Sequence, residues 1–222
     1  MIANMNRGAK ILIVALAIGI LIIGVSQMIP YSSSLNNNKP TNNSNKEINY
    51  FNELTAKAEL LRSGPLDPIR FNSLDAAIDS YLEQQLITDA AAVSLKSSIN
   101  KIFTGRVYRQ CDYFLKGLHG TTMENVHLLN LLQTRIGPNQ SITNFRSQIS
   151  WYQYYSVVLP KKVNTFIEAG ISNYTEEEYQ LLKNQVQNMP GLSSAYSRSS
   201  KFKSINASIM KKLFQFNYEY NN

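Results

Sequence analysis

The sequence predicts an all-α protein made of an N-terminal transmembrane helix, a flexible tether and a bundle of about six to seven helices. Residues 11–25 form a run of fifteen positions without a charged or polar side chain. Residues 30–46 are rich in Ser, Asn and Pro. Beyond them, apolar residues recur every three or four positions, and no stretch shows the sustained alternation of a strand. We therefore expect an anchor at 1–29, a tether at 30–46 and a helical domain at 47–222.

The apolar run is long enough to cross a bilayer. A helix over residues 11–29 would measure about 28 Å, close to the thickness of the hydrocarbon core. Pro30 then ends the helix. Arg7 and Lys10 precede the span and favour a cytoplasmic N-terminus. The expected location is the inner cell membrane, with residues 11–29 in the lipid and the C-terminal domain in the periplasm or outside the cell.

Other interpretations of this segment stay open. Gly24, Val25 and Ser26 form a triplet that suits a signal peptidase, and cleavage after Ser26 would release the remaining chain. The run would also fit the core helix of a soluble protein. Ala15 and Gly19 form a small-xxx-small pair, against which a second transmembrane helix can pack closely. A homo-oligomer formed through the span therefore also stays open.

The tether has little to bury, because only Tyr31 and Leu35 offer side chains that pack. As a flexible coil, its seventeen residues would reach roughly 20 to 25 Å. The domain after it is predicted from helical spacing and from capping residues at the helix starts. The expected helices are 46–61; 74–87 after a cap at Ser73; 89 to 115 or 118 after Thr88; 123–136; 141–160, kinked or restarted at Pro160; 176–189 after Thr175; and 199–218.

The charge of the chain is mildly basic. The net charge is +7, and without Arg7 and Lys10 there remain 20 basic side chains against 15 acidic ones. Nucleic-acid binding requires a concentrated basic stripe, so no nucleic-acid partner is predicted. An acidic protein surface or anionic lipid headgroups fit better. Cys111 is the only cysteine, and we expect it to be buried as a small apolar side chain. An intermolecular disulfide through it is the alternative.

One short stretch holds the residue types that bind metals. Cys111, Asp112, His119, Glu124 and His127 lie within seventeen residues, and the last two form the E-x-x-H spacing of di-iron bundles. Such bundles need that motif twice, and the chain has no third histidine. Thr121 and Glu124 also fit a capping box, in which the glutamate has a structural role at the start of a helix. Neither a metal nor a cofactor is predicted.

Signatures of catalysis are missing from the sequence. There is no G-x-S-x-G elbow, no phosphate-binding glycine loop and no haem attachment motif. Three consecutive glutamates at 176–178 follow Thr175 and would occupy the first turn of a helix. Carboxylates are stabilised there by the positive end of the helix dipole. No catalytic residue is therefore predicted, and the protein is not expected to be an enzyme.

Two surfaces are candidates for interaction. Residues 151–155 concentrate four aromatic side chains, which suit a sugar-stacking platform or a protein interface. The last helix carries an apolar stripe bordered by lysines, which suits an anionic lipid surface or a partner's groove. Alternatively, this stripe packs on the protein's own bundle. The candidate residues are Trp151, Tyr154, Lys201, Phe202, Lys203, Lys212 and Phe216.

The sequence therefore predicts a membrane-anchored, non-catalytic interaction or scaffold subunit of an envelope assembly, with one or more protein partners. The first alternative is a module that binds glycan or lipid through the aromatic residues or the basic last helix. The second alternative is an enzyme of unidentified type.

Overall fold

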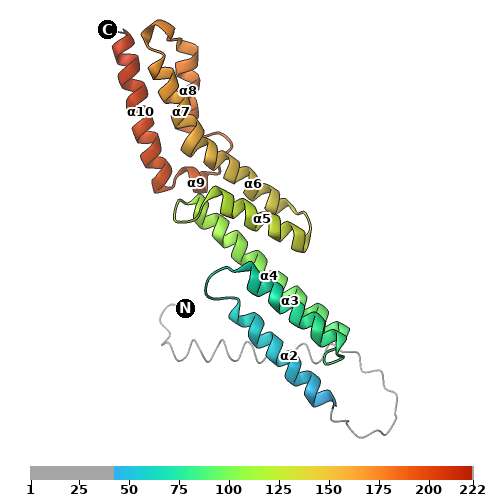
Figure 1. Ribbon diagram of the computed structural model, residues 1–222. Coiled ribbons are helices and arrows are strands. Elements are labelled where there is room, and N and C mark those ends of the chain that lie inside the picture. Colours follow the sequence, from blue (N-terminus) through green and yellow to red (C-terminus); the bar gives the residue numbers. More distant parts are fainter. Residues whose placement is uncertain (1–42, 222) are drawn as a thin grey trace, which may run out of the picture. The chain divides into compact units, whose positions relative to one another are not determined.

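The structure is a computed structural model, and it describes residues 43–221 (Figure 1). Within this range every regular element is a helix and no strand occurs, which confirms an all-helical domain. None of the helices in the described range is both long and apolar enough to cross a membrane. The predicted anchor at 11–29 and most of the predicted tether at 30–46 lie outside the described residues.

The first group of helices consists of α2 (Asn43–Leu60), α3 (Pro68–Glu83) and the long α4 (Asp89–Leu115). Each of the three packs on the other two. Phe71 of α3 and Phe103 of α4 meet edge to face in the core, with ring centroids 4.9 Å apart. Aromatic pairs of this kind stabilise a core beyond the burial of their area.

The second group is built on the C-terminal half of α4, where α5 (Thr122–Ile136) and α6 (Gln140–Gln153) pack against it. The predicted capping box is confirmed, because the Thr121 side chain accepts from the backbone N–H of Glu124 and the Glu124 carboxylate accepts from that of Thr121. Because α4 contacts α2, α3, α5 and α6, it connects the first two groups.

The helix of α6 is interrupted just before Pro160, close to the predicted position. It passes through a π-helical turn, η1 (Tyr154–Val158), into α7 (Leu159–Glu168). The backbone N–H of Leu159 donates to the carbonyl of Tyr154, five residues earlier. Proline has no N–H and its ring clashes with the carbonyl four residues before it, and the wider turn accommodates both effects.

The third group comprises α7, α8 (Glu176–Asn188) and α10 (Ser200–Asn221), which lie side by side (Figure 1). A short 3₁₀ turn, η2 (Ile171–Asn173), connects α7 to α8, and the short α9 (Ser194–Ser197) precedes α10. The core of this group is formed by buried side chains of all three helices: Val163, Phe166, Tyr179, Leu182, Val186, Ile209, Leu213 and Phe216.

Several helix starts differ from the sequence-based boundaries. α2 begins at Asn43, inside the predicted tether. α3 begins at Pro68 rather than after Ser73, because the Asp67 side chain caps it and proline suits the first helical position. α6 is capped by Asn139 rather than opened by Ser141. The predicted caps at Thr88, Thr121 and Thr175 are confirmed.

Candidate functional site

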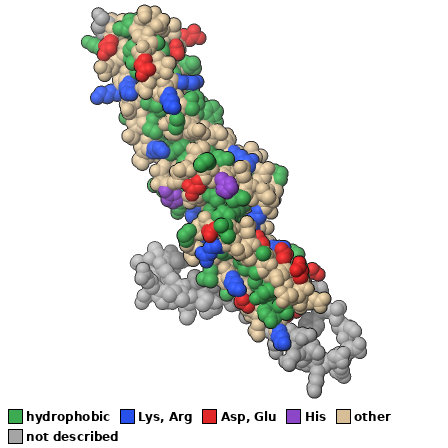
Figure 2. Space-filling model, in the orientation of Figure 1, with side chains coloured by type: hydrophobic (Ala, Val, Ile, Leu, Met, Phe, Trp, Pro, Cys, Tyr) green, Lys and Arg blue, Asp and Glu red, His purple; other side chains and the backbone are tan. Residues whose placement is uncertain are grey.

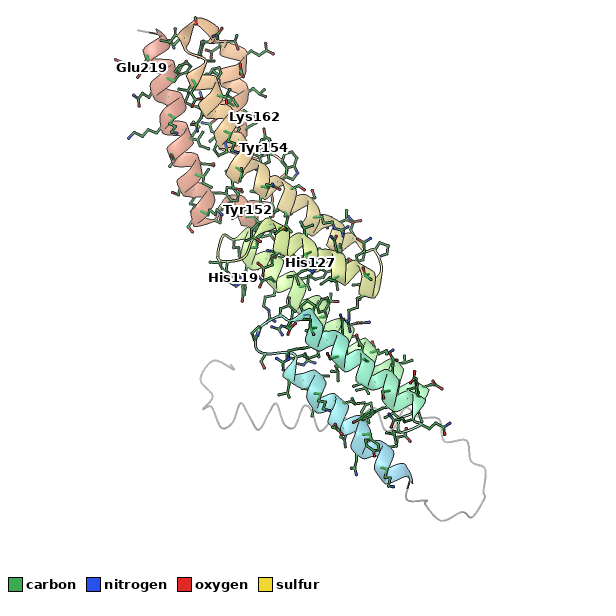
Figure 3. The ribbon with its side chains drawn as sticks, in the orientation of Figure 1. His119, His127, Tyr152, Tyr154, Lys162 and Glu219 are labelled. Carbon is green, nitrogen blue, oxygen red and sulfur yellow. The ribbon has the colours of Figure 1, made fainter. Side chains whose placement is uncertain are left out.

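The predicted aromatic residues lie where α6 passes into η1. Trp151 is 37% exposed and stacks on Tyr155, with ring centroids 5.8 Å apart. The hydroxyl of the half-buried Tyr154 donates to Oε1 of Gln185 on α8, at 2.8 Å. The ammonium of Lys162 lies 5.4 Å from the centre of the Tyr154 ring (Figure 3). These rings are therefore engaged in contacts within the domain, while Trp151 stays partly exposed.

The apolar stripe of α10 faces the interior. Phe202 is fully buried and meets Tyr152 edge to face at 5.1 Å, while Phe216 is 6% exposed and meets Phe166 at 5.4 Å. Both phenylalanines therefore belong to the core and not to an interaction surface, as expected if the stripe packs on the protein's own bundle.

The three lysines named with that stripe have different surroundings. The ammonium of Lys201 donates to the Tyr152 hydroxyl and lies 4.6 Å from the centre of its ring. Lys212 donates to Oδ1 of Asn164 on α7 at 3.0 Å. Lys203 is exposed. Basic side chains are spread over the visible face rather than gathered in one stripe (Figure 2). The seven predicted residues therefore do not form one surface.

A groove between η1–α7 and α8, here called the α7–α8 groove, has a volume of about 620 Å³. Three aliphatic side chains in it reach water: Val157 is 45% exposed, Val158 is 38% exposed and Leu181 of α8 is 55% exposed. The full lining comprises Val157, Val158, Lys161, Lys162, Thr165, Phe166, Ala169, Asn173, Glu178, Leu181, Leu182 and Gln185.

The groove has a basic wall and an acidic edge. Lys161 and Lys162 come from the first turn of α7, and Glu178 comes from the first turn of α8. Among the residues that the structure describes, none of these three side chains forms an ion pair. In this described part of the chain, no carboxylate neutralises the two lysines and no basic side chain neutralises Glu178, although the Lys162 ammonium also lies near the Tyr154 ring.

Regular helical spacing does not predict this groove, because a π-helical turn forms part of it. With regular helical spacing, Val158 would share a face with Trp151 and Tyr155. In the structure Tyr155 and Leu159 are buried, whereas Val158 is exposed. The wider turn changes the angular position of the residues that follow it, and π turns occur frequently at functional sites. The sequence signal for an irregular turn is Pro160, which lies in an otherwise helical pattern. Its ring would clash with the carbonyl of Ser156, four residues earlier, in a regular α-helix.

The side chains of metal-binding type in residues 111–127 do not meet at one point in the structure. His119 lies in the loop between α4 and α5, and His127 lies on α5 at a separate place (Figure 3). Cys111 is fully buried, and burial raises the pKa of its thiol to about 12. In residues 43–221, no group of three or more His, Cys, Asp or Glu side chains is placed to hold a metal ion.

A scan against protein-family models and searches of curated proteins and of solved structures found no match to this chain. The functional interpretation therefore depends on the geometry of the α7–α8 groove.

Proposed function

We propose that the protein is a membrane-anchored, non-catalytic interaction subunit that binds an amphipathic helix of a partner protein in the α7–α8 groove. The observation that carries this proposal is the cluster formed by Val157, Val158 and Leu181, which stay accessible although the same helices bury most of their other apolar side chains. An amphipathic helix that lays its apolar face into a groove is a recurring mode of recognition.

The energetics favour a transient partner. Full burial of an aliphatic side chain contributes about 1.5–3 kcal/mol. Val157, Val158 and Leu181 are already half covered by their own domain, so each would contribute about half of that value or less. Part of this gain offsets the entropy lost on association. Hydrophobic contact alone therefore gives modest affinity, and complementary charges are needed for specificity.

The charges indicate which partner helix fits. Lys161 and Lys162 form the basic wall of the groove, and Glu178 lies on the opposite helix. A partner helix with carboxylates along one border of its apolar face would pair with the two lysines. The net charge of +7 would also speed encounter with an acidic partner, because complementary charge raises association rates more than affinity.

The same proposal includes the anchor. Residues 11–29 would hold the chain in the inner membrane, and the helical domain would stand in the periplasm or outside the cell. Alkaline carbonate extraction of membranes tests this: the full-length chain should remain in the pellet. Release into the supernatant, or a mature N-terminus at Gln27, would contradict the anchor without bearing on the groove.

The partner proposal is tested with charge reversal in the full-length, membrane-associated chain. Lys161→Glu together with Lys162→Glu should abolish chemical crosslinking to a partner that the wild-type chain captures in intact cells. The matched control is Lys203→Glu with Lys211→Glu, two exposed lysines of α10 away from the groove. A partner retained by both double variants, or lost from both, would contradict docking in the groove. A crosslink to a second copy of the chain would replace the proposed partner with a homodimer.

A further inference from the structure

A second pocket, here called the arginine pocket, lies between the α2–α3 loop, the C-terminal half of α4 and the α4–α5 loop. Its volume is about 380 Å³, enough for a small charged group. It is lined by Arg62, Ser63, Gly64, Pro65, Leu66, Arg106, Arg109, Gln110, Tyr113 and His119. Arg106, Arg109, Gln110 and Tyr113 recur at the three- and four-residue spacing of one face of α4.

Arg106 has a structural role in this pocket. Its guanidinium donates to the backbone carbonyls of Leu61, at 2.6 Å, and Gly64, which holds the α2–α3 loop against α4. Partial burial, together with the positive charges of Arg109 and Arg70, lowers the pKa of Arg106. Several positive charges are therefore crowded together on this side of the domain.

Arg109 is the arginine that remains available. It is exposed, and among the described residues its side chain forms no hydrogen bond and no ion pair. Acidic side chains in the segments around the pocket are already used by other groups. Asp112 of α4 pairs with Lys116. Glu59 pairs with Arg62, and Glu124 accepts from the backbone of the α4–α5 loop. No carboxylate lines the pocket.

Amide, phenol and imidazole side chains complete the lining. Nε2 of Gln110 lies 3.4 Å from Nδ1 of His119, and the His119 ring meets Tyr113 edge to face at 5.5 Å. The loop that carries His119 is held in place by the capping box of α5 and by the buried Asn125, whose Nδ2 donates to the carbonyl of Thr121 at 2.8 Å. The pocket therefore presents guanidinium, amide, hydroxyl and imidazole groups on supported segments.

We propose that the arginine pocket binds a dianionic phosphate group, carried either by a soluble phosphate monoester or by a lipid headgroup. Arginine binds phosphate oxygens in a bidentate manner and is the preferred residue for this purpose. Arg109 contacts the phosphate directly. Arg106, whose own partners are neutral backbone carbonyls, adds positive charge, and Gln110, Tyr113 and His119 supply hydrogen bonds. This site is separate from the α7–α8 groove, and neither proposal depends on the other.

The test uses the full-length chain, purified in a neutral detergent, and isothermal titration calorimetry. One arm titrates inorganic phosphate, and the other titrates short-chain phosphatidic acid, with short-chain phosphatidylcholine as the reference. Binding of phosphate alone indicates a soluble ligand, and binding of phosphatidic acid alone indicates a lipid headgroup. Saturable binding in either arm supports the site only if it depends on the pocket.

That dependence is measured with Arg109→Gln, which should weaken binding about tenfold, as expected for the loss of a charge-assisted hydrogen bond. Gln110→Glu, which places a carboxylate in the pocket, should abolish binding. Arg198→Gln changes another exposed arginine and should bind like the wild type. Absence of binding in both arms, or equal binding by Arg109→Gln and the wild type, would overturn the proposal. Since Arg109 is exposed and without partners, thermal unfolding should show this variant to be folded.

Discussion

Gly191 lies directly against the indole ring of Trp151. A Cβ atom at Gly191 would be 2.2 Å from Cε2 of the indole, and the backbone there has a φ of +90°. The same loop is held by the Gln148 side chain, whose Nε2 donates to the Gly191 carbonyl at 3.0 Å. The Tyr155 hydroxyl donates to the neighbouring Pro190 carbonyl at 2.6 Å. The α8–α9 connection therefore covers one face of the aromatic cluster, which leaves the indole only partly exposed.

We expect Gly191→Ala to lower the free energy of unfolding by about 2–4 kcal/mol, because it adds a strained positive φ and a steric clash. Trp151 is the only tryptophan, so its fluorescence reports the change at this site. The emission maximum should shift to longer wavelength as the ring moves into water. An unchanged spectrum together with unchanged stability would contradict this packing.

Gly105→Ala is the matched glycine control. Gly105 lies within α4, it has no neighbouring atom within 4 Å of an added Cβ, and its φ is not positive. Alanine restricts the unfolded chain and favours the helix, so stability should rise by about 0.5–1 kcal/mol. Chemical denaturation should show a lower free energy of unfolding for Gly191→Ala and a higher one for Gly105→Ala.

Arg135 connects three helices. Its guanidinium pairs with Asp75 of α3 and donates to Oδ1 of Asn100 on α4 at 2.6 Å, while its carbon Cζ lies 5.4 Å from the centre of the Phe103 ring. Because the side chain is only 13% exposed, Arg135→Ala should destabilise the domain by about 2–4 kcal/mol. Thermal and urea unfolding would measure this loss.

The comparison for Arg135 is Lys96→Ala, which removes the exposed ion pair with Asp79. Exposed pairs contribute about 0–1 kcal/mol, so this variant should unfold nearly like the wild type. Equal destabilisation by the two substitutions would indicate that Arg135 does not connect the helices as described.

The thiol of Cys111 should resist modification in the folded protein. It is fully buried and its pKa is raised to about 12 by burial, whereas alkylation requires an accessible thiolate. At pH 8, iodoacetamide should label the native chain far more slowly than the urea-unfolded chain. Mass spectrometry counts the added groups, and rapid labelling without denaturant would place Cys111 at the surface.

Alkaline pH should destabilise the domain. Burial raises the pKa of the Cys111 thiol from 9.0 to about 12 and the pKa of the Tyr155 hydroxyl from 10.0 to about 12. Above pH 9 the unfolded chain ionises these groups before the folded chain does, so stability present below pH 9 is lost as the pH rises towards 12. Cys111→Ala should flatten the first part of this decline in urea titrations at each pH.

Helix positions could be predicted largely from local chemistry. Thr88, Thr121 and Thr175 precede apolar-periodic segments, and each caps the helix that follows. The competing starts at Ser73 and Ser141 were wrong, because Asp67 and Asn139 provide earlier caps. A capping residue is a local signal, but the choice between two such residues in one segment depends on packing.

The candidate site could not be predicted in the same way. The groove depends on a π-helical turn that exposes Val157 and Val158, and on the approach of α8, which brings Leu181 to the same place. Neither the turn nor the approach leaves a periodic pattern in the sequence. The arginine pocket likewise brings together Arg62, Arg109 and His119 from three separate segments.

The central claim is that a partner helix occupies the α7–α8 groove, and site-specific photocrosslinking in intact cells tests it most directly. A photoreactive benzoyl-phenylalanine in place of Leu181 should give one discrete adduct with another protein. The same amino acid in place of Ile69, an exposed apolar residue of α3 that is 73% accessible, should not give this adduct. The adduct should disappear when Lys161 and Lys162 are replaced by glutamate. Equal adducts from both positions, or none from Leu181, would contradict the account.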